Sequence, residues 1–423
     1  MRRGVGLTLL AALSVVVSSC GNGVIDKNTD GIPPAEATRT LRVLLPSFPP
    51  STKGREEFQK VVDDSQKTYP KMKVEPDFAT YNNLNEKMST AIAAGIPYDV
   101  MVTGVGWIQP FASKRIFEDL GKYGLTPDVI KEKSTAALIP AVTYDGKLYG
   151  YPLIADTRAV ALRKSAFREV GLDPDKPPTS LADIKVAAEK LTKRDKDDNI
   201  TRSGFDLASA TGLRQSFTTF LTSTGTQLYV GGEPNFDNKA GLDTLLWIKS
   251  MINNVQPYGQ TNAAQQPLVL TGEAAMGIVG GAVDCSDKGI GQKNCEDLKF
   301  FRFNSGKQIE YVGGDLASIG SRSRHKDAAW SFIQSLTKPA TLDALAKLNK
   351  KVPAYKDSAN SPQAKSNPLS QFVADGLIYA ANENEVPANW LEMRGNFDIQ
   401  LTQAVLGQKD PAKVLANLAG QSR

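Results

Sequence analysis

Short apolar runs alternate with helically spaced apolar positions in the first hundred residues. The run Leu41–Leu45 ends at Pro46 and suits a buried strand, and the next apolar positions recur with helical spacing until Pro70. The expected elements are strands at 41–45, near 72–76 and at 99–102, with helices over 58–69 and 84–92 between them. This βαβαβ order predicts a mostly parallel sheet, in which ligands bind beyond the carboxyl ends of the strands.

A second α/β set follows a long extended segment. Residues 148–162 predict an extended segment, which we interpret as a crossing between two lobes. A capped helix from Ser180, a strand near Gly204 and helices from Leu213 and Asp237 come next. Residues 274–279 predict a strand that returns to the first lobe, residues 316–319 a further crossing, and the remainder is mostly helical, with a last helix from Pro411.

These patterns predict an α/β protein of two lobes, each a mostly parallel sheet flanked by helices. The chain is 41% hydrophobic and 22% charged, which is ordinary for globular proteins, and it is long enough for two cores. We expect residues 38–120 and 265–313 in lobe 1 and residues 121–264 and 314–423 in lobe 2. The hinge crossings are expected near 115–160 and 312–320.

The first twenty residues predict secretion. Arg2 and Arg3 precede the apolar stretch Val5–Val17, whose 13 residues fall short of the roughly 20 that span a membrane. Small residues before Cys20 resemble a bacterial lipobox, so residues 1–19 are expected to be removed and Cys20 to carry lipid. The alternative is an ordinary signal peptide with an incidental cysteine. The polar segment 20–37 would then tether an extracytoplasmic domain to the cell membrane.

The charge balance limits the classes of binding partner, and the cysteines predict a disulfide. Without Arg2 and Arg3 the chain has 48 basic residues, from 50 − 2, against 45 acidic ones, a net charge of +3 with no basic cluster. Nucleic acid is therefore not expected as a partner. Cys285 and Cys295 would remain as an even pair and predict one disulfide. Two unpaired thiols are the alternative, which Cα atoms more than about 7 Å apart would favour.

Few residues could carry catalysis. The chain has one histidine, His325, between Arg324 and Lys326, and it lacks the sequence signatures of serine hydrolases, zinc sites and phosphate loops. No metal and no cofactor are expected. Asp156 and Asp315 lie at the predicted crossings and could form the acid pair of a glycosidase, but carboxylates equally accept hydrogen bonds from sugar hydroxyls. We expect a binding protein and not an enzyme.

Three stretches resemble a known family. They are Tyr81–Val100, with Ala-Gly-Ile-Pro-Tyr-Asp-Val, Tyr144–Phe167, with Asp-Gly-Lys-Leu-Tyr-Gly-Tyr-Pro, and Thr271–Leu336, with Gly-Glu-Ala-Ala-Met-Gly. Their order and spacing resemble bacterial solute-binding proteins of sugar ABC importers, the group typified by maltose-binding protein. In the second stretch Leu162-Arg163-Lys164 stands where the family usually has Tyr-Asn-Lys. The resemblance implies two lobes that close around a ligand across a hinge of two or three strands, and no chemistry on that ligand.

The expected ligand contacts lie at strand ends and crossings. Trp107 follows the glycine turn after the third strand, and Phe48 and Tyr81 follow the first two, although each ring could instead pack in a core. Asp156 falls where the family has an acidic ligand contact, and the late helical region often carries a stacking aromatic. The expected ligand-binding residues are Ser47, Phe48, Tyr81, Trp107, Asp156, Arg158, Thr211, Arg214, Gln215, Gly313, Gly314, Asp315, Trp390 and Arg394.

The sequence therefore predicts a monomeric substrate-binding lipoprotein that passes a small carbohydrate, an oligosaccharide or amino sugar, to the permease of an ABC importer. It would touch the membrane through its lipid only. Arg158, Arg214 and Arg394 raise a second ligand class, because guanidinium groups suit phosphate. A glycerophosphodiester or sugar phosphate would use them, although Asp156 and Asp315 would repel an anion.

Overall fold

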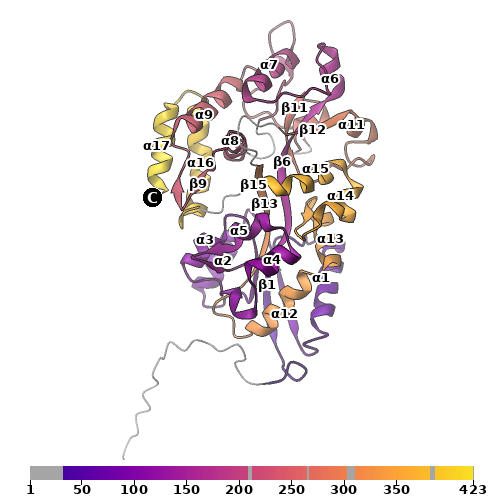
Figure 1. Cartoon of the computed structure of the whole chain (residues 1–423), viewed down its shortest axis with the longest axis vertical. Coiled ribbons are helices and arrows are strands. Elements are labelled where there is room, and N and C mark those ends of the chain that lie inside the picture. The colour runs from indigo at the N-terminus through magenta and orange to yellow at the C-terminus, as the bar shows by residue number, and fades with distance from the viewer. Residues whose placement is uncertain (1–31, 208–211, 264–265, 303–309, 382–385, 423) are drawn as a thin grey trace, which may run out of the picture.

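The computed structural model describes residues 32–207, 212–263, 266–302, 310–381 and 386–422. The predicted signal segment, Cys20 and Thr211 lie outside this part of the chain. Figure 1 shows two groups of helices and strands along the longest axis, with two long strands between them. These strands are β6 (Tyr151–Arg163) and β13 (Glu310–Ile319). They match the two predicted crossings, so the predicted two-lobed α/β fold is confirmed.

One mixed sheet runs through the molecule. Its main path is β11-β6-β13-β3-β1-β2, where β1 is Thr40–Leu45, β2 Lys73–Phe78, β3 Val100–Gly104 and β11 Met276–Gly280. β1 pairs in parallel with β2 and β3, as the βαβαβ pattern predicts, whereas β13 and β11 pair antiparallel to β6. The short strands β12 (Leu298–Phe301), β14 (Val352–Pro353) and β15 (Ala380–Ala381) join at its margins. The parallel part therefore lies in one lobe and the antiparallel part at the hinge.

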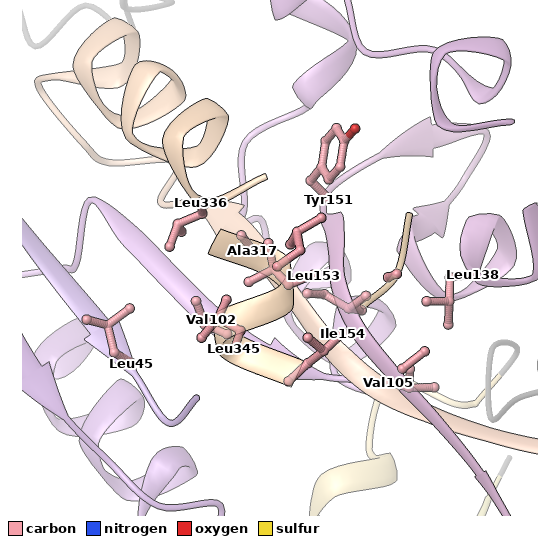
Figure 2. Close-up of a cluster of buried hydrophobic side chains, with 14 of the residues drawn as sticks. Leu45, Val102, Val105, Leu138, Tyr151, Leu153, Ile154, Ala317, Leu336 and Leu345 are labelled. Atoms are coloured by element: carbon pink, nitrogen blue, oxygen red, sulfur yellow. The ribbon is translucent and has the colours of Figure 1, made fainter. Parts of the chain in front are cut away.

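The core of lobe 1 joins the N-terminal strands to helices from late in the sequence. Helices α1 (Thr52–Ser65) and α2 (Leu84–Ala93) lie between its parallel strands in the sequence. Helices α12 (Lys326–Leu336), α13 (Pro339–Asn349), α14 (Pro362–Ser366) and α15 (Pro368–Gly376) complete it. Figure 2 shows Leu45 and Val102 of the N-terminal strands near Leu336 and Leu345 of these helices. All four side chains are buried.

The core of lobe 2 is built mainly from helices. These are α7 (Leu181–Leu191), α8 (Gly212–Ser223), α9 (Lys239–Met251), α16 (Trp390–Val405) and α17 (Pro411–Gln421). The Trp390 ring is fully buried and meets the rings of Tyr229 and Phe397 edge-on at centroid distances of 5.5 and 5.8 Å. The predicted helix starts are confirmed, because Ser180 and Asp410 accept hydrogen bonds from the backbone amides of Asp183 and Lys413.

The two cores divide the chain differently from the expected segments. Residues 316–377 share the lobe 1 core and were expected in lobe 2. The apolar face of α12 packs against α1, where the rings of Phe58 and Phe332 lie 6.2 Å apart. Met276 and Ile278 of β11 join the lobe 2 core, although a return to lobe 1 was expected, because β11 pairs with the far end of β6, from Met276 opposite Leu162.

Smaller elements complete the chain. The remaining helices and strands are α3 (Ile108–Ser113), α4 (Pro127–Lys133), α5 (Ile139–Val142), α6 (Lys164–Glu169), α10 (Leu268–Thr271), α11 (Gln292–Asp297), β4 (Thr143–Tyr144), β5 (Lys147–Leu148), β7 (Lys193–Arg194), β8 (Ile200–Arg202), β9 (Tyr229–Val230) and β10 (Glu233–Pro234). Cys285 and Cys295 form a disulfide with Cα atoms 5.6 Å apart, as predicted. Among the helices that the structure describes, none has the length and apolar composition needed to cross a membrane.

Candidate functional site

The hinge strands present a row of polar side chains on one face. Asp156 and Arg158 are two residues apart on β6 and therefore point to the same side. They form an ion pair at 2.6 Å, and Arg158 also donates a hydrogen bond of 3.0 Å to Oε1 of Gln215 on α8. Gly313 lies opposite Asp156 on β13, where any side chain would collide with the Asp156 carboxylate. Glycine at position 313 thus lets the carboxylate lie against the neighbouring strand.

The Asp315 carboxylate accepts hydrogen bonds from three other parts of lobe 1. It is 1% exposed and accepts hydrogen bonds from Oγ of Ser47 at 2.5 Å, from the Tyr81 hydroxyl at 2.7 Å and from Nζ of Lys351 at 2.7 Å. Ser47 follows β1, and Lys351 directly precedes β14. The buried charge of Asp315 is therefore paired with a cation and bound by two hydroxyl groups, as a buried carboxylate requires.

The electrostatics of this row are balanced. Burial disfavours the charged form of Asp156, but the nearby Arg158 and Lys351 outweigh it and hold the pKa of the carboxyl below its ordinary value. Burial likewise acts to lower the pKa of Lys351, but Asp315 and Asp156 raise it above the ordinary value. Burial and the Asp315 charge raise the pKa of Tyr81, which keeps its hydroxyl protonated and able to donate. The row therefore combines two acidic side chains, Asp156 and Asp315, with two basic ones, Arg158 and Lys351.

A cavity of about 270 Å³ opens onto Asp156 and Arg158. Residues 278–284, at the end of β11 and just after it, form one wall together with Gly289 and Ile290, and residues 349–351 form another. Gln266, Pro267 and Leu270 line a further side. None of the described residues that line the cavity carries an aromatic ring. The cavity therefore offers charged groups, backbone and aliphatic surface to a ligand.

The aromatic residues predicted to contact ligand differ in their burial and in their packing partners. The Trp107 ring is 3% exposed and stacks on Phe111 at a centroid distance of 6.0 Å, with Tyr81 edge-on at 6.4 Å. Arg394 of lobe 2 lies 5.7 Å from the centre of the Trp107 ring, so this ring meets the opposite lobe. Tyr81 remains 36% exposed.

Two predicted contacts pack in the cores. Phe48 is buried against Phe58 at a centroid distance of 5.5 Å, and Trp390 is buried in lobe 2. Neither residue is among those that line the cavity, so their role as ligand contacts stays a prediction. Their sequence positions gave no means of separating these outcomes from that of Tyr81.

The structure brings some of the other predicted residues together and separates the rest. Ser47, Tyr81, Asp156, Arg158, Gln215, Gly313 and Asp315 form the hinge row with its donors. Arg214 is buried in lobe 2, where its guanidinium lies over the Trp390 ring and its backbone amide donates to Asp398. The Gly314 carbonyl accepts a hydrogen bond from the Val105 amide within the sheet.

The sequence interpretation missed two residues of the row. Lys351 pairs with Asp315, and the Tyr311 ring lies 5.2 Å from the Arg158 guanidinium. Tyr311 could have been found from its alternation with Gly313 and Asp315 on the same strand face. Lys351 carried no local signal, because its partner is 36 residues away in the sequence.

Contacts near the start of α16 join the lobes in the described conformation. Leu391 packs against both hydrophobic cores. Lys114, which caps the end of α3 in lobe 1, forms an ion pair of 3.6 Å with Glu392 of α16. With the contact between Trp107 and Arg394, these pairs place lobe 2 directly against lobe 1 on the side of α3.

Comparison with known proteins identifies the family. Residues 49–343 match the family described as bacterial extracellular solute-binding protein, which is well over half of the chain. The chain belongs to this family. The predicted resemblance is confirmed, and the family is one of extracellular proteins that bind solutes.

Individual relatives of this solute-binding protein span nearly its whole length. The maltotriose-binding protein of Pyrococcus abyssi is 25% identical over 374 residues, covering 82% of this chain and 76% of the relative. The GacH receptor of Streptomyces glaucescens, solved unliganded and with acarbose, superposes with a TM-score of 0.72 at 20% identity, covering 91% of this chain and 98% of that one. UgpB of Mycobacterium tuberculosis, solved with glycerophosphocholine, gives 0.70 at 17% identity, covering 90% and 97%. These structures support the two-lobed fold.

Proposed function

We propose that this protein captures a small carbohydrate, an oligosaccharide or amino sugar, between its lobes and delivers it to the permease of an ABC importer. It acts as a monomer anchored outside the cytoplasm by a lipid on Cys20. The named relatives that bind maltotriose and acarbose support a sugar ligand. Closure follows from ligand contacts with both lobes, since a ligand shifts a conformational equilibrium by its differential affinity for the two states.

The observation that carries the proposal is the polar row at the hinge. Asp156 and Arg158 lie on the strand that links the lobes and also line the cavity. Arg158 bonds to Gln215 of lobe 2, while Lys351 and Asp315 tie the row to lobe 1. Paired carboxylates and cations can exchange their mutual bonds for bonds to adjacent hydroxyl groups of a sugar.

The same geometry argues against hydrolysis. A glycosidase needs one carboxylic acid with a raised pKa to protonate the leaving group. The pKa of Asp156 is lowered by Arg158 and Lys351 despite burial, and Asp315 is occupied by Ser47, Tyr81 and Lys351. Asp156 and Asp315 therefore serve as hydrogen-bond acceptors in our proposal.

A glycerophosphodiester is the second candidate ligand. The cavity lacks aromatic rings among its described lining residues but includes Arg158, Lys350 and Lys351. The carboxylates that would repel an anion are already paired with cations. The structural similarity to a protein solved with glycerophosphocholine also favours this class. Of the three arginines that suggest this class, Arg158 lines the cavity, whereas Arg214 and Arg394 lie against tryptophan rings.

Thermal-shift and calorimetric titration would test both candidates. The panel contains maltotriose, mannotriose, glucosamine and glycerophosphocholine, and chromatography checks that each ligand is recovered intact. Asp156→Asn should abolish binding of a neutral sugar, because it removes acceptor capacity, while Asp195→Asn on an exposed turn should not change it. A ligand that still binds to Asp156→Asn but no longer binds to Arg158→Gln would be identified as a phosphodiester. Cleaved products would contradict the binding proposal.

A further inference from the structure

The wall of the cavity that follows β11 is a closely packed turn. Gly281 has a φ of 77°, and any side chain there would collide with the Lys350 carbonyl on the opposite wall. The Ile290 amide donates a hydrogen bond of 2.9 Å to the Asp284 carbonyl, which folds the wall back on itself. Residues 280–290, which we call the cavity wall, thus depend on backbone contacts within a turn that has little apolar core of its own.

The disulfide closes this turn covalently. Cys285 lies within the cavity wall and Cys295 on α11, ten residues later. Both sulfur-bearing side chains are half-buried against the core of lobe 1. Cross-linking a loop of this length removes conformational freedom that the wall would otherwise have to lose when it becomes ordered around a ligand.

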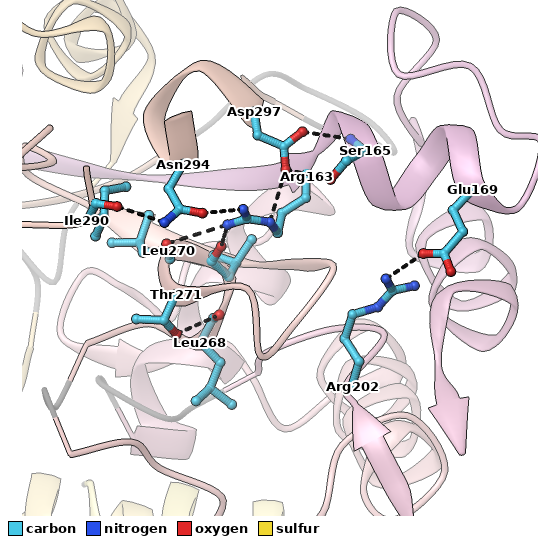
Figure 3. Close-up of polar contacts among 11 residues, drawn as sticks. Arg163, Ser165, Glu169, Arg202, Leu268, Leu270, Thr271, Ile290, Asn294 and Asp297 are labelled. Atoms are coloured by element: carbon cyan, nitrogen blue, oxygen red, sulfur yellow. Dashed lines mark hydrogen bonds and ion pairs between the residues drawn. The ribbon is translucent and has the colours of Figure 1, made fainter. Parts of the chain in front are cut away.

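Arg163 is connected to the same turn by polar contacts, which Figure 3 shows. Its guanidinium donates to Oδ1 of Asn294 at 2.7 Å and to the Val269 carbonyl at 3.0 Å, and pairs with Asp297 at 3.1 Å. Asn294 in turn donates 2.7 Å to the carbonyl of Ile290, which lines the cavity. A chain of hydrogen bonds therefore runs from the end of β6 to the cavity wall.

Arg163 is, with Leu162, one of two residues that differ from the Tyr-Asn-Lys implied by the family resemblance. An arginine can hold several acceptors at once through its planar fork, whereas an asparagine at the same position is too short to reach them all. Arg163 contacts Asn294 and Asp297, which lie on α11 together with Cys295 of the disulfide.

We infer that the Cys285–Cys295 disulfide and the Arg163–Asn294 pair are positioning elements that hold the cavity wall in its ligand-binding conformation. This inference rests on the proposed function, because it assumes that the cavity at Asp156 and Arg158 takes the ligand. It assigns to the disulfide an effect on affinity as well as on stability. Without the bond, part of the cost of ordering the wall is paid on binding.

Hydrogen exchange and calorimetry on the full chain would test this inference. The variants are Cys285→Ser with Cys295→Ser, and Asn294→Ala. Gln292→Ala is the matched control, because Gln292 lies on the same helix and its exposed side chain donates a hydrogen bond to Glu296, one turn further along that helix. The titrated solutes are maltotriose, mannotriose and glycerophosphocholine.

Amides of the cavity wall, residues 280–290, should exchange at least about fivefold faster in both test variants, while those of β1 keep the rate of the parent. Affinity for whichever solute binds should fall about tenfold, which corresponds to ~1.4 kcal/mol. Unchanged exchange of the wall, or unchanged affinity despite faster exchange, would overturn the inference. If no solute binds the parent, the proposed function fails for these ligands, and the exchange rates alone decide whether the disulfide and Asn294 position the wall.

Discussion

Replacing Lys351 by methionine should destabilise the ligand-free protein through the charge left on Asp315. Methionine keeps an unbranched side chain of similar length but removes the cation that lies 2.7 Å from the carboxylate. Asp315 is 1% exposed, so water cannot take the place of the lysine. Removing one partner of a buried ion pair costs about 3–5 kcal/mol. We expect about 3 kcal/mol, the low end of that range, because Ser47 and Tyr81 still donate to Asp315.

The expected change in melting temperature follows from the size of the chain. An unfolding entropy of about 2.1 cal/mol/K per residue gives roughly 0.8 kcal/mol/K for the described residues, so 3 kcal/mol lowers Tm by about 4 °C. Differential scanning calorimetry at pH 7 measures this shift. Lys347→Met is the control, because Lys347 is an exposed residue of the preceding helix.

A double variant separates lost charge pairing from lost packing. Lys351→Met with Asp315→Asn leaves no unpaired charge and should recover more than half of the lost stability, since buried pairs can be replaced by neutral groups at little cost. The reasoning is refuted if Lys351→Met melts within about 1 °C of the control, or if the double variant is no more stable than the single one.

Three further perturbations test other parts of the structure. Asp64 has a pKa lowered to about 2, because Lys338 and Lys67 outweigh the effect of its burial. The stability that its charged form contributes is therefore present above pH ~4 and is lost as the pH falls towards 2. In Lys338→Met, NMR titration of the Asp64 carboxyl should show its pKa moving back towards 3.8. Trp107→Ala should cost the ligand-free protein about 3 kcal/mol in denaturant unfolding, and an unchanged midpoint would show that the ring does not pack on Phe111. Leu391→Ser should separate the lobes and raise the radius of gyration in X-ray scattering, and an unchanged radius would contradict its bridging role.

Local patterns predicted the elements of the fold well. The strands at 40–45, 73–78 and 100–104 lie within a few residues of the expected positions, because apolar runs and proline boundaries depend on neighbouring residues only. The crossing expected at 148–162 is β6 at 151–163, whose burial on both faces produces apolar runs on either side of Asp156 and Arg158. The disulfide followed from an even pair of cysteines in a chain expected to be secreted.

Assignment to lobes required information that local patterns do not contain. The apolar face of α12 shows that Phe332 and Leu336 must be buried, but not that α1 would cover them. Phe48 and Tyr81 each follow a parallel strand, yet Phe48 packs inward and Tyr81 reaches Asp315. These outcomes depend on partners far away in the sequence, which periodicity does not specify.

The interleaved cores constrain the order in which the protein can fold. The core of lobe 1 includes Leu41 and Leu377, and that of lobe 2 includes Val160 and Ala419. A chain that emerges from the ribosome or crosses a membrane N-terminus first therefore exposes β1, β2 and β3 long before the helices that cover them exist. Contacts so distant in sequence slow folding and leave apolar surface exposed to aggregation in the meantime. A holding chaperone that binds the first 300 residues should thus raise the yield of native protein more than one that binds the C-terminal helices.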